Sequence, residues 1–563
     1  MLIKRHSATA ALVTLLAVGA LALSTMQHPS DPTDNAGDSS ADHPEGLRPA
    51  LGGVTLDPLL RDEVRPNVVV IMADDMREDD LRFMPNVQRL IGDEGVQFKN
   101  MLSPQPLCCP ARASFLTGQY THNHGVWSHA EPFGFRVLRD DATLPVWLHD
   151  VGYNTAFLGK YLNGYGLQPL PDGSSSVHYV PPGWSDWRGA VDGGFEEGSA
   201  YAGSTYKYFD TTLNVNGVLE SHQGKYQTRM FGRETEQIIA ENARSTRPFF
   251  FWASYVAPHH GNPFEPDDPG EVERDDGVTT TFKTPARPGD VKGKFDDTVL
   301  AAPGVEGEKD VSDKPFFIRE LPPLNDEERV AVLNVTRQRA EALAVLDEEV
   351  ARTIEALEDT GELDNTIVAF TSDNGFFLGE HRNRRGKILP YEPSLRVPLM
   401  MRGPGIPKGV VREDPFTMID FAPTFLDAAG AAGQDSIDGV SMLDVARDGD
   451  QGWDRGILTQ TGPRQVSDDV EESDNFLVEG DGPSPLRFSQ GVRTSQYLYV
   501  EHASREKELY DLRQDPGELD NLLARGVRRV VADQLARVLD LLRNCVGSEC
   551  AEPLPESLRS RPR

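Results

Sequence analysis

Cys108 and Cys109 begin a short segment, Cys-Cys-Pro-Ala-Arg-Ala-Ser-Phe-Leu-Thr-Gly, that ends at Gly118. Proline suits the first turn of a helix and glycine the position just after the last turn, so the segment predicts a short helix. Cys108 would then lie at the helix N-terminus, where free N–H groups and the helix dipole favour an anion. The cysteines could be buried structural residues, or Cys108 could be a nucleophile, because helix N-termini lower thiol pKa values.

Four short apolar segments read as strands buried on both faces of a parallel sheet. Helical patterns separate them, most clearly over residues 326–357, so we predict an α/β fold with a doubly wound, mostly parallel sheet. Ligands of such sheets bind beyond the carboxyl ends of the strands, so the polar residues that follow the strands are expected to converge. These are Asp74 and Asp75 after 67–72, Lys160 after 153–158, His259 and His260 after 248–255, and Asp373 and Asn374 after 366–371.

Three acids and one amide among these residues suggest a metal site. Asp74, Asp75, Asp373 and Asn374 offer only hard oxygen ligands, which Ca²⁺ or Mg²⁺ prefers and zinc does not. The alternative is a solvated turn or a helix cap. Carboxylates at neighbouring strand ends would repel one another without a cation, so the metal interpretation is favoured.

Composition limits the class of protein. The 563 residues carry a formal charge of −32, which disfavours nucleic-acid binding, and four cysteines are too few for a disulfide scaffold. Residues 1–26 combine basic residues with an apolar run, which predicts a signal peptide and a secreted protein without stable membrane association; an uncleaved membrane anchor is the alternative.

The rest of the chain divides into three parts. Residues 27–63 resemble a disordered linker, 64–445 a catalytic domain, and 446–563 a smaller α+β domain with a final helix near 527–543. Residues 263–323 read as a long surface excursion, and 467–485 as an acidic loop. In the last part, Cys545 and Cys550 are predicted to form a disulfide, since export permits the bond and a short glycine-containing loop can close it; two free thiols are the alternative.

The cysteine segment resembles the type I sulfatase motif, Cys-X-Pro-X-Arg followed by Ala-Ser-X-Leu-X-Gly. Residues 508–522, with their Glu-Leu-Tyr-Asp-Leu run, also resemble this family, and the likeness extends over about residues 66–522. The resemblance implies an alkaline-phosphatase-like sulfatase fold. It also implies that a separate formylglycine-generating enzyme converts Cys108 to formylglycine (3-oxoalanine), and that this residue binds calcium with Asp74, Asp75, Asp373 and Asn374.

The resemblance also implies how the reaction proceeds. A hydroxyl of the hydrated aldehyde at residue 108 attacks the sulfur of a sulfate ester, and the second hydroxyl later expels sulfate. Arg112, Lys160 and Lys387 would hold the sulfate group, and His259 would protonate the departing alcohol. Where many members have a histidine two residues after the strand-end lysine, this chain has Leu162 and then Asn163, which leaves one acid–base role unassigned.

Residues 107–110, 120–125, 159–163 and 386–392 are most similar to N-acetylglucosamine-6-sulfatases and heparan 6-O-endosulfatases. They imply a sulfated amino sugar or glycan as substrate. The alternatives are an arylsulfatase, a phosphate or phosphonate monoester hydrolase, and a non-catalytic glycan-binding relative. The basic run 381–387 is expected to lie at the rim of the site, where Arg384 and Arg385 would bind substrate beyond the scissile sulfate; a solvated loop is the alternative. The residues expected to bind substrate are His124, His260, His381, Arg384 and Arg385.

Overall fold

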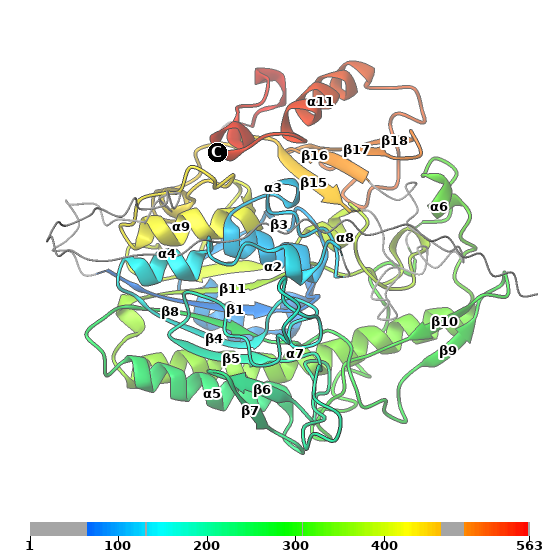
Figure 1. Ribbon diagram of the computed structural model, residues 1–563. Helices are drawn as coiled ribbons and strands as arrows, with labels where there is room; N and C mark the ends of the chain where they lie inside the picture. The colour runs from blue at the N-terminus through cyan, green and yellow to red at the C-terminus, as the bar shows by residue number, and fades with distance from the viewer. Residues whose placement is uncertain (1–64, 130–131, 307, 463–488, 561–563) are drawn as a thin grey trace, which may run out of the picture. The chain divides into compact units, whose positions relative to one another are not determined.

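A ten-stranded mixed sheet is the centre of the fold (Figure 1). The computed structural model describes residues 65–129, 132–306, 308–462 and 489–560, and the predicted signal peptide, linker and acidic loop fall outside these residues. In spatial order the strands are β13 (Val410–Arg412), β2 (Val96–Phe98), β12 (Leu399–Arg402), β11 (Thr366–Ser372), β1 (Asn67–Ala73), β8 (Phe249–Ser254), β4 (Asn154–Lys160), β5 (Asp186–Ala190), β6 (Thr212–Val215) and β7 (Val218–Ser221).

The four strands predicted from the sequence are neighbours in this sheet, in the order β11-β1-β8-β4. All three pairs are parallel; in β1, Val70 lies opposite Ala369 on one side and Trp252 on the other. Every residue of β1 is buried, which explains its unbroken apolar sequence. The prediction of a mostly parallel sheet is confirmed, and the four carboxyl ends lie at one edge.

Helices cover both faces of the sheet (Figure 1). One face packs against α2 (Cys108–Thr117), α4 (Leu144–Asp150) and α9 (Phe421–Ala428), and the other against α5 (Gln227–Asn242) and α7 (Asp326–Asp359). A capping box between Asn325 and Glu328 starts α7. The shorter helices are α1 (Pro85–Val87), α3 (Thr121–His124), α6 (Phe316–Arg319), α8 (Glu392–Leu395) and α10 (Leu443–Asp448).

A smaller antiparallel sheet follows near the C-terminus, as predicted. It comprises β15 (Ile457–Thr461), β16 (Ser489–Arg493), β17 (Tyr497–His502) and β18 (Lys507–Asp511). Helix α11 (Arg529–Leu542) packs its apolar side on this sheet through Leu535 and Leu539. The structure contains the disulfide between Cys545 and Cys550 that the sequence predicted.

The expectation that residues 263–323 form only a surface excursion is wrong in part. This segment contains a hairpin of β9 (Gly270–Glu273) and β10 (Thr279–Phe282), and it buries Phe282 and Arg287. Arg287 pairs with Glu265 within the segment and with Glu341 on α7, so distant carboxylates hold it in place. A second small pair joins β3 (Met101–Leu102) to β14 (Phe416–Thr417). Over the part of the chain described here, no helix has the length and apolarity needed to cross a membrane.

Candidate active site

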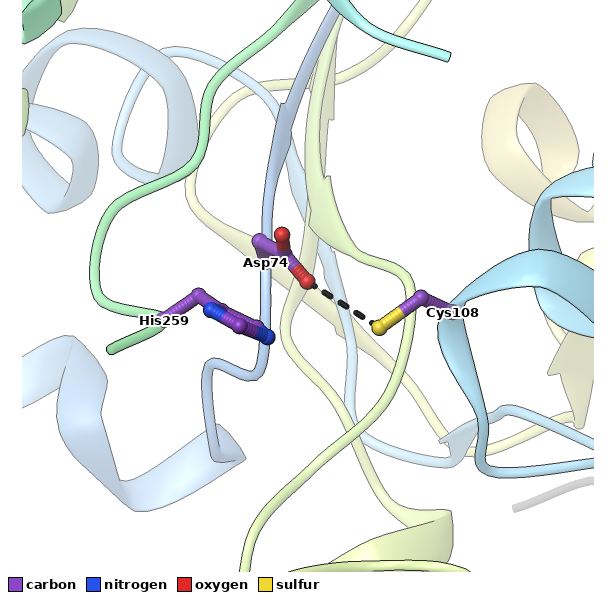
Figure 2. Close-up of side chains that lie close together, drawn as sticks. All are labelled: Asp74, Cys108 and His259. Carbon is purple, nitrogen blue, oxygen red and sulfur yellow. Dashed lines mark hydrogen bonds between the residues drawn. The ribbon is translucent and has the colours of Figure 1, made fainter. Parts of the chain in front are cut away.

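The carboxyl ends of β1 and β11 meet the N-terminus of α2. Ligand atoms of Asp74, Asp75, Asp373 and Cys108 all lie within 4.8 Å of one another, and all four residues are fully buried. Figure 2 shows Asp74 and His259 facing Cys108, whose Sγ lies 3.3 Å from Asp74 Oδ1. Successive side chains of a strand point to opposite faces, but the left-handed backbone of Asp75 (φ 67°) breaks that alternation just after the strand.

Helix α2 has the predicted bounds. It begins at Cys108 and is followed by Gly118, whose φ of 68° suits the left-handed position after a helix. The helix N-terminus therefore points into the space between the strand ends, and Arg112, one turn later, reaches the same space. The position of Cys108 follows directly from these two helix signals.

The oxygen atoms at this site fit a hard divalent cation. Asp75 Oδ2 and Asn374 Oδ1 are buried and accept no hydrogen bond from any residue that the structure describes, which is costly for polar atoms without a ligand. The Asn374 amide donates to Asp75 Oδ1 at 2.7 Å and to the Gly375 carbonyl at 2.9 Å, an arrangement that leaves its oxygen available. Three carboxylates and one amide oxygen are the donor set of Ca²⁺ or Mg²⁺.

Three cationic side chains enter the site from different elements. Lys160 Nζ, at the end of β4, lies 2.6 Å from Asp74 Oδ2. Lys387 Nζ lies 2.5 Å from Asp75 Oδ1 and 2.9 Å from Cys108 Sγ. Arg112 donates from Nε to Asp373 at 2.8 Å. Its Nη2 has no hydrogen-bond partner among the described residues and lies 3.9 Å from Asp74. All three are buried, so a bound anion would meet weakly screened positive charge.

Burial and charge set opposite pKa shifts at this site. Burial opposes ionisation of Asp74, but Lys160, His259 and Arg112 outweigh it and lower the pKa of that carboxyl. Burial, reinforced by Asp74, raises the pKa of Asp373 to about 6. Burial and Asp74 also raise the pKa of the Cys108 thiol well above its usual range.

His259 lies beside the acidic cluster, with Nε2 3.8 Å from Asp75 Oδ2. Its Nδ1 lies 2.6 Å from the carbonyl oxygen of His260, which can only accept, so Nδ1 carries a proton. Nε2 is thus the nitrogen that faces the site. This arrangement gives His259 one fixed ring orientation.

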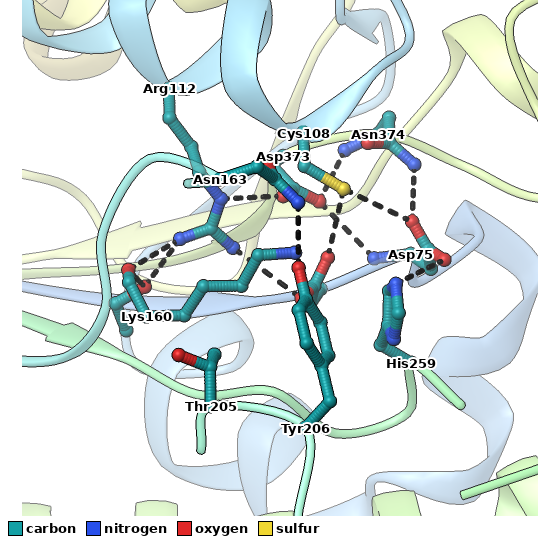
Figure 3. A network of polar contacts seen from close by, with 12 residues as sticks. Asp75, Cys108, Arg112, Lys160, Asn163, Thr205, Tyr206, His259, Asp373 and Asn374 are labelled. Carbon is teal, nitrogen blue, oxygen red and sulfur yellow. Dashed lines mark hydrogen bonds and ion pairs between the residues drawn. The ribbon is translucent and has the colours of Figure 1, made fainter. Parts of the chain in front are cut away.

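Tyr206 and Asn163 are site residues that sequence reasoning did not select. The Tyr206 ring lies 4.9 Å from Lys160 Nζ and 4.8 Å from the His259 ring, and Figure 3 shows it alongside both. Asn163 donates from Nδ2 to the Tyr206 hydroxyl at 2.6 Å. Asn163 stood out in the sequence only as a departure from the family pattern, and Tyr206 lies in an irregular segment without periodicity.

Several residues predicted to bind substrate are held elsewhere. His124 contacts Ser114 Oγ at 3.1 Å, and burial lowers its pKa to about 3. His381 is 2% exposed and pairs with Glu308, and Arg384 is fully buried with its Nε 2.7 Å from Glu328 Oε1. Arg385 is 5% exposed. The loop is therefore buried and not exposed, and its residues His381 and Arg384 are held by Glu308 and Glu328. His260 is half-buried beside His259.

Comparisons with known proteins agree with this geometry. A model of the sulfatase family matches residues 66–431. The chain is 30% identical over 533 residues to an arylsulfatase of Volvox carteri, and the aligned region covers 87% of this chain and 76% of that protein. It is 28% identical over 518 residues to the N-acetylglucosamine-6-sulfatase of Homo sapiens, covering 87% and 86%.

A solved structure, BT4656 in complex with its substrate D-glucosamine-2-N,6-O-disulfate, has a similar fold. It superposes with a TM-score of 0.64 at 21% identity and covers 85% of this chain and 97% of that chain. The fold is that of the alkaline-phosphatase-like sulfatases. The chain belongs to the sulfatase family and is a sulfuric ester hydrolase.

Proposed function

We propose that this chain is a secreted sulfatase that removes sulfate from a sulfated amino sugar or glycan. In this proposal residue 108 works as a formylglycine, made from Cys108 by a formylglycine-generating enzyme, and Asp74, Asp75, Asp373 and Asn374 hold Ca²⁺, with Mg²⁺ as the alternative. The observation that carries it is the convergence of buried oxygen ligands, three cations and Cys108 on one point.

In this proposal the buried acidic ligands hold the cation, and the buried cationic side chains bind the substrate. When bound, the cation would polarise the oxygen nucleophile that residue 108 provides. Asp75 Oδ2 and Asn374 Oδ1, which accept no hydrogen bond, are the oxygens best placed to hold the cation. The Asn374 amide, by donating to Asp75, fixes the orientation of that carboxylate.

Cationic groups would bind the sulfate ester and stabilise the charge that develops as it is cleaved. Lys387, beside Cys108, reaches the reacting position from a loop, and Lys160, beside Asp74, reaches it from the end of β4. The unpartnered Nη2 of Arg112 is available for a sulfuryl oxygen. His259 would give a proton from Nε2 to the departing alcohol, because its Nδ1 is already committed to the His260 carbonyl.

Two relatives support different substrates. The N-acetylglucosamine-6-sulfatase of Homo sapiens supports an amino sugar 6-sulfate, and the Volvox carteri arylsulfatase, at slightly higher identity, supports an aryl sulfate as the second candidate. The similarity to BT4656, solved with a disulfated glucosamine, favours the sugar. Export is supported by the basic and apolar N-terminal segment.

A substrate panel tests this proposal. Protein co-produced with a formylglycine-generating enzyme is assayed with N-acetylglucosamine-6-sulfate, an aryl sulfate, and phosphate and phosphonate monoesters. We expect the highest kcat/KM with the sugar sulfate. A preference for the aryl sulfate would support the second candidate, and a preference for the phosphorus esters would contradict both.

A further inference from the structure

A cavity of about 150 Å³ lies next to the candidate active site, and the two share Tyr206. His260, Gly261, Phe264, Lys283 and Thr284 complete most of its wall. Complete small-molecule sites enclose about 300–1,000 Å³, so this cavity has room for only part of a ligand. Since Tyr206 also contacts Lys160 and His259, a ligand that occupies the cavity would extend from the reacting centre.

The backbone around this cavity is firmly held. Gly261 donates its N–H to the Thr284 carbonyl at 3.1 Å, and Asn262 donates to the Tyr206 carbonyl at 2.7 Å. A Cβ at Gly261 would lie 2.5 Å from Tyr206 O, so only glycine permits this close approach. These backbone contacts therefore hold the wall of the cavity in a defined conformation.

Phe264 gives the cavity an apolar surface. It is 62% exposed, and among the described residues it is the only aromatic member of the exposed large hydrophobic side chains. Aromatic rings supply large, rigid apolar area where a surface contacts a ligand. A flat ring beside polar groups suits the C–H face of a sugar.

Lys283 gives the cavity a positive charge without a matching acid. Among the residues that the structure describes, no carboxylate forms an ion pair with Lys283. The nearby acids Glu265 and Asp267 are already paired with Arg287 and Lys292. A lysine left uncompensated in a chain of net charge −32 can attract an anionic ligand.

We propose that this cavity is a subsite for the sugar next to the one that loses sulfate, and that Lys283 binds an anionic group on that neighbouring sugar. Phe264 would pack against the sugar ring, and Lys283 would bind a carboxylate or a sulfate. The inference rests on the proposed function. It assigns to the 260–284 segment the recognition role that Arg384 and Arg385 were expected to fill.

Binding to an inert enzyme tests the subsite. Cys108→Ala protein is titrated calorimetrically with three disaccharides that share a 6-sulfated glucosamine and differ in the neighbour: a neutral hexose, a uronic acid or a sulfated sugar. We expect the anionic neighbours to bind about tenfold more tightly than the neutral one, as for a charge-assisted hydrogen bond. The two anionic arms distinguish carboxylate from sulfate as the natural group.

Two further variants complete the design. Lys283→Gln, added to the inert enzyme, should abolish the preference for anionic neighbours. The matched control Lys225→Gln removes an exposed lysine outside the cavity and should retain the preference. Phe264→Ala should weaken binding of all three disaccharides.

An anionic preference that survives Lys283→Gln, or the absence of any preference, would overturn the subsite. Failure of the proposed function is a separate result. It appears as no turnover of N-acetylglucosamine-6-sulfate by protein in which residue 108 has been converted to formylglycine, and that monosaccharide has no neighbouring sugar for the subsite to bind.

Discussion

The strand-end site, which Lys387 enters, and the preceding loop residues 381–385 both bury positive charge, but they differ in the partners of that charge. Lys387 reaches Asp75 and Cys108, in a cluster where two buried oxygens accept no hydrogen bond. Arg384, three residues earlier, makes two contacts with the Glu328 carboxylate, and that charge is closed off within the fold. Oxygen ligands around Cys108 thus mark the region suited to bind a cation, whereas the pairs of Arg384 with Glu328 and of His381 with Glu308 hold the loop in the fold.

Of the changes considered, removal of divalent cations should have the largest effect on catalytic activity. Chelation should lower kcat by more than about 100-fold, because Asp74, Asp75 and Asp373 then repel one another around the reacting position. Activity is measured after chelation and after addition of Ca²⁺, Mg²⁺ or Zn²⁺. Ca²⁺ or Mg²⁺ should restore it and Zn²⁺ should not, since the protein ligands are oxygens. Full activity in protein shown to be metal-free would contradict the cation site.

The second-largest effect is expected from the substitution Lys387→Ala. It removes a buried ammonium beside residue 108, so kcat should fall about 10²–10³-fold, as when a charge-stabilising donor is lost. Steady-state kinetics on a small sulfate ester measure the effect. Lys387→Arg, which keeps the charge, should recover part of the rate. An unchanged kcat would place Lys387 outside the chemistry.

Arg384→Gln should act on stability instead. It leaves Glu328 buried without its cation, which should cost about 3–5 kcal/mol of unfolding free energy. Urea unfolding measures the loss, and kcat of the folded protein should stay unchanged. The double variant with Glu328→Gln retains a capping side chain and should recover part of the stability. If Arg384→Gln instead raised KM for glycans, the rim interpretation would return.

The smallest expected effect is a pH dependence at His381. Burial opposes its charge, but Glu308 and Glu518 raise its pKa from 6.5 to about 9. Its contribution to stability is therefore complete below pH 6.5 and is lost as the pH rises through about 9. Replacement by Gln should cost about 1–3 kcal/mol at pH 6 and less at pH 9.5. Urea unfolding at both values tests this, and an equal cost at both would contradict the paired, charged imidazolium.

Much of the active site could be predicted from the sequence because parallel strands end at one edge. Once 67–72 and 366–371 were read as buried strands, Asp74, Asp75, Asp373 and Asn374 had to meet. Lys387 came only from family resemblance, since it lies in a loop with left-handed residues, such as Ile388 at φ 81°.

The remainder depends on contacts between distant segments. Arg384 is buried because Glu328 lies across the fold on α7, and nothing in the sequence near 384 indicates that partner. Tyr206 and Lys283 lie in irregular segments where no period predicts which way a side chain points. For this reason the sequence predicts a surface position for the cationic run 381–387 and does not predict the cavity beside Tyr206.

The most direct test of the central claim is the rate of sulfate release plotted against the fraction of molecules in which residue 108 has lost sulfur and two hydrogens and gained oxygen. Preparations made with increasing amounts of a formylglycine-generating enzyme provide the range, and mass spectrometry of the peptide that contains residue 108 gives the fraction. Cys109→Ala protein is the matched control and should fall on the same line, because Cys109 is the unmodified neighbour. We predict a straight line through the origin. Substantial sulfate release from preparations in which Cys108 is intact would contradict the account.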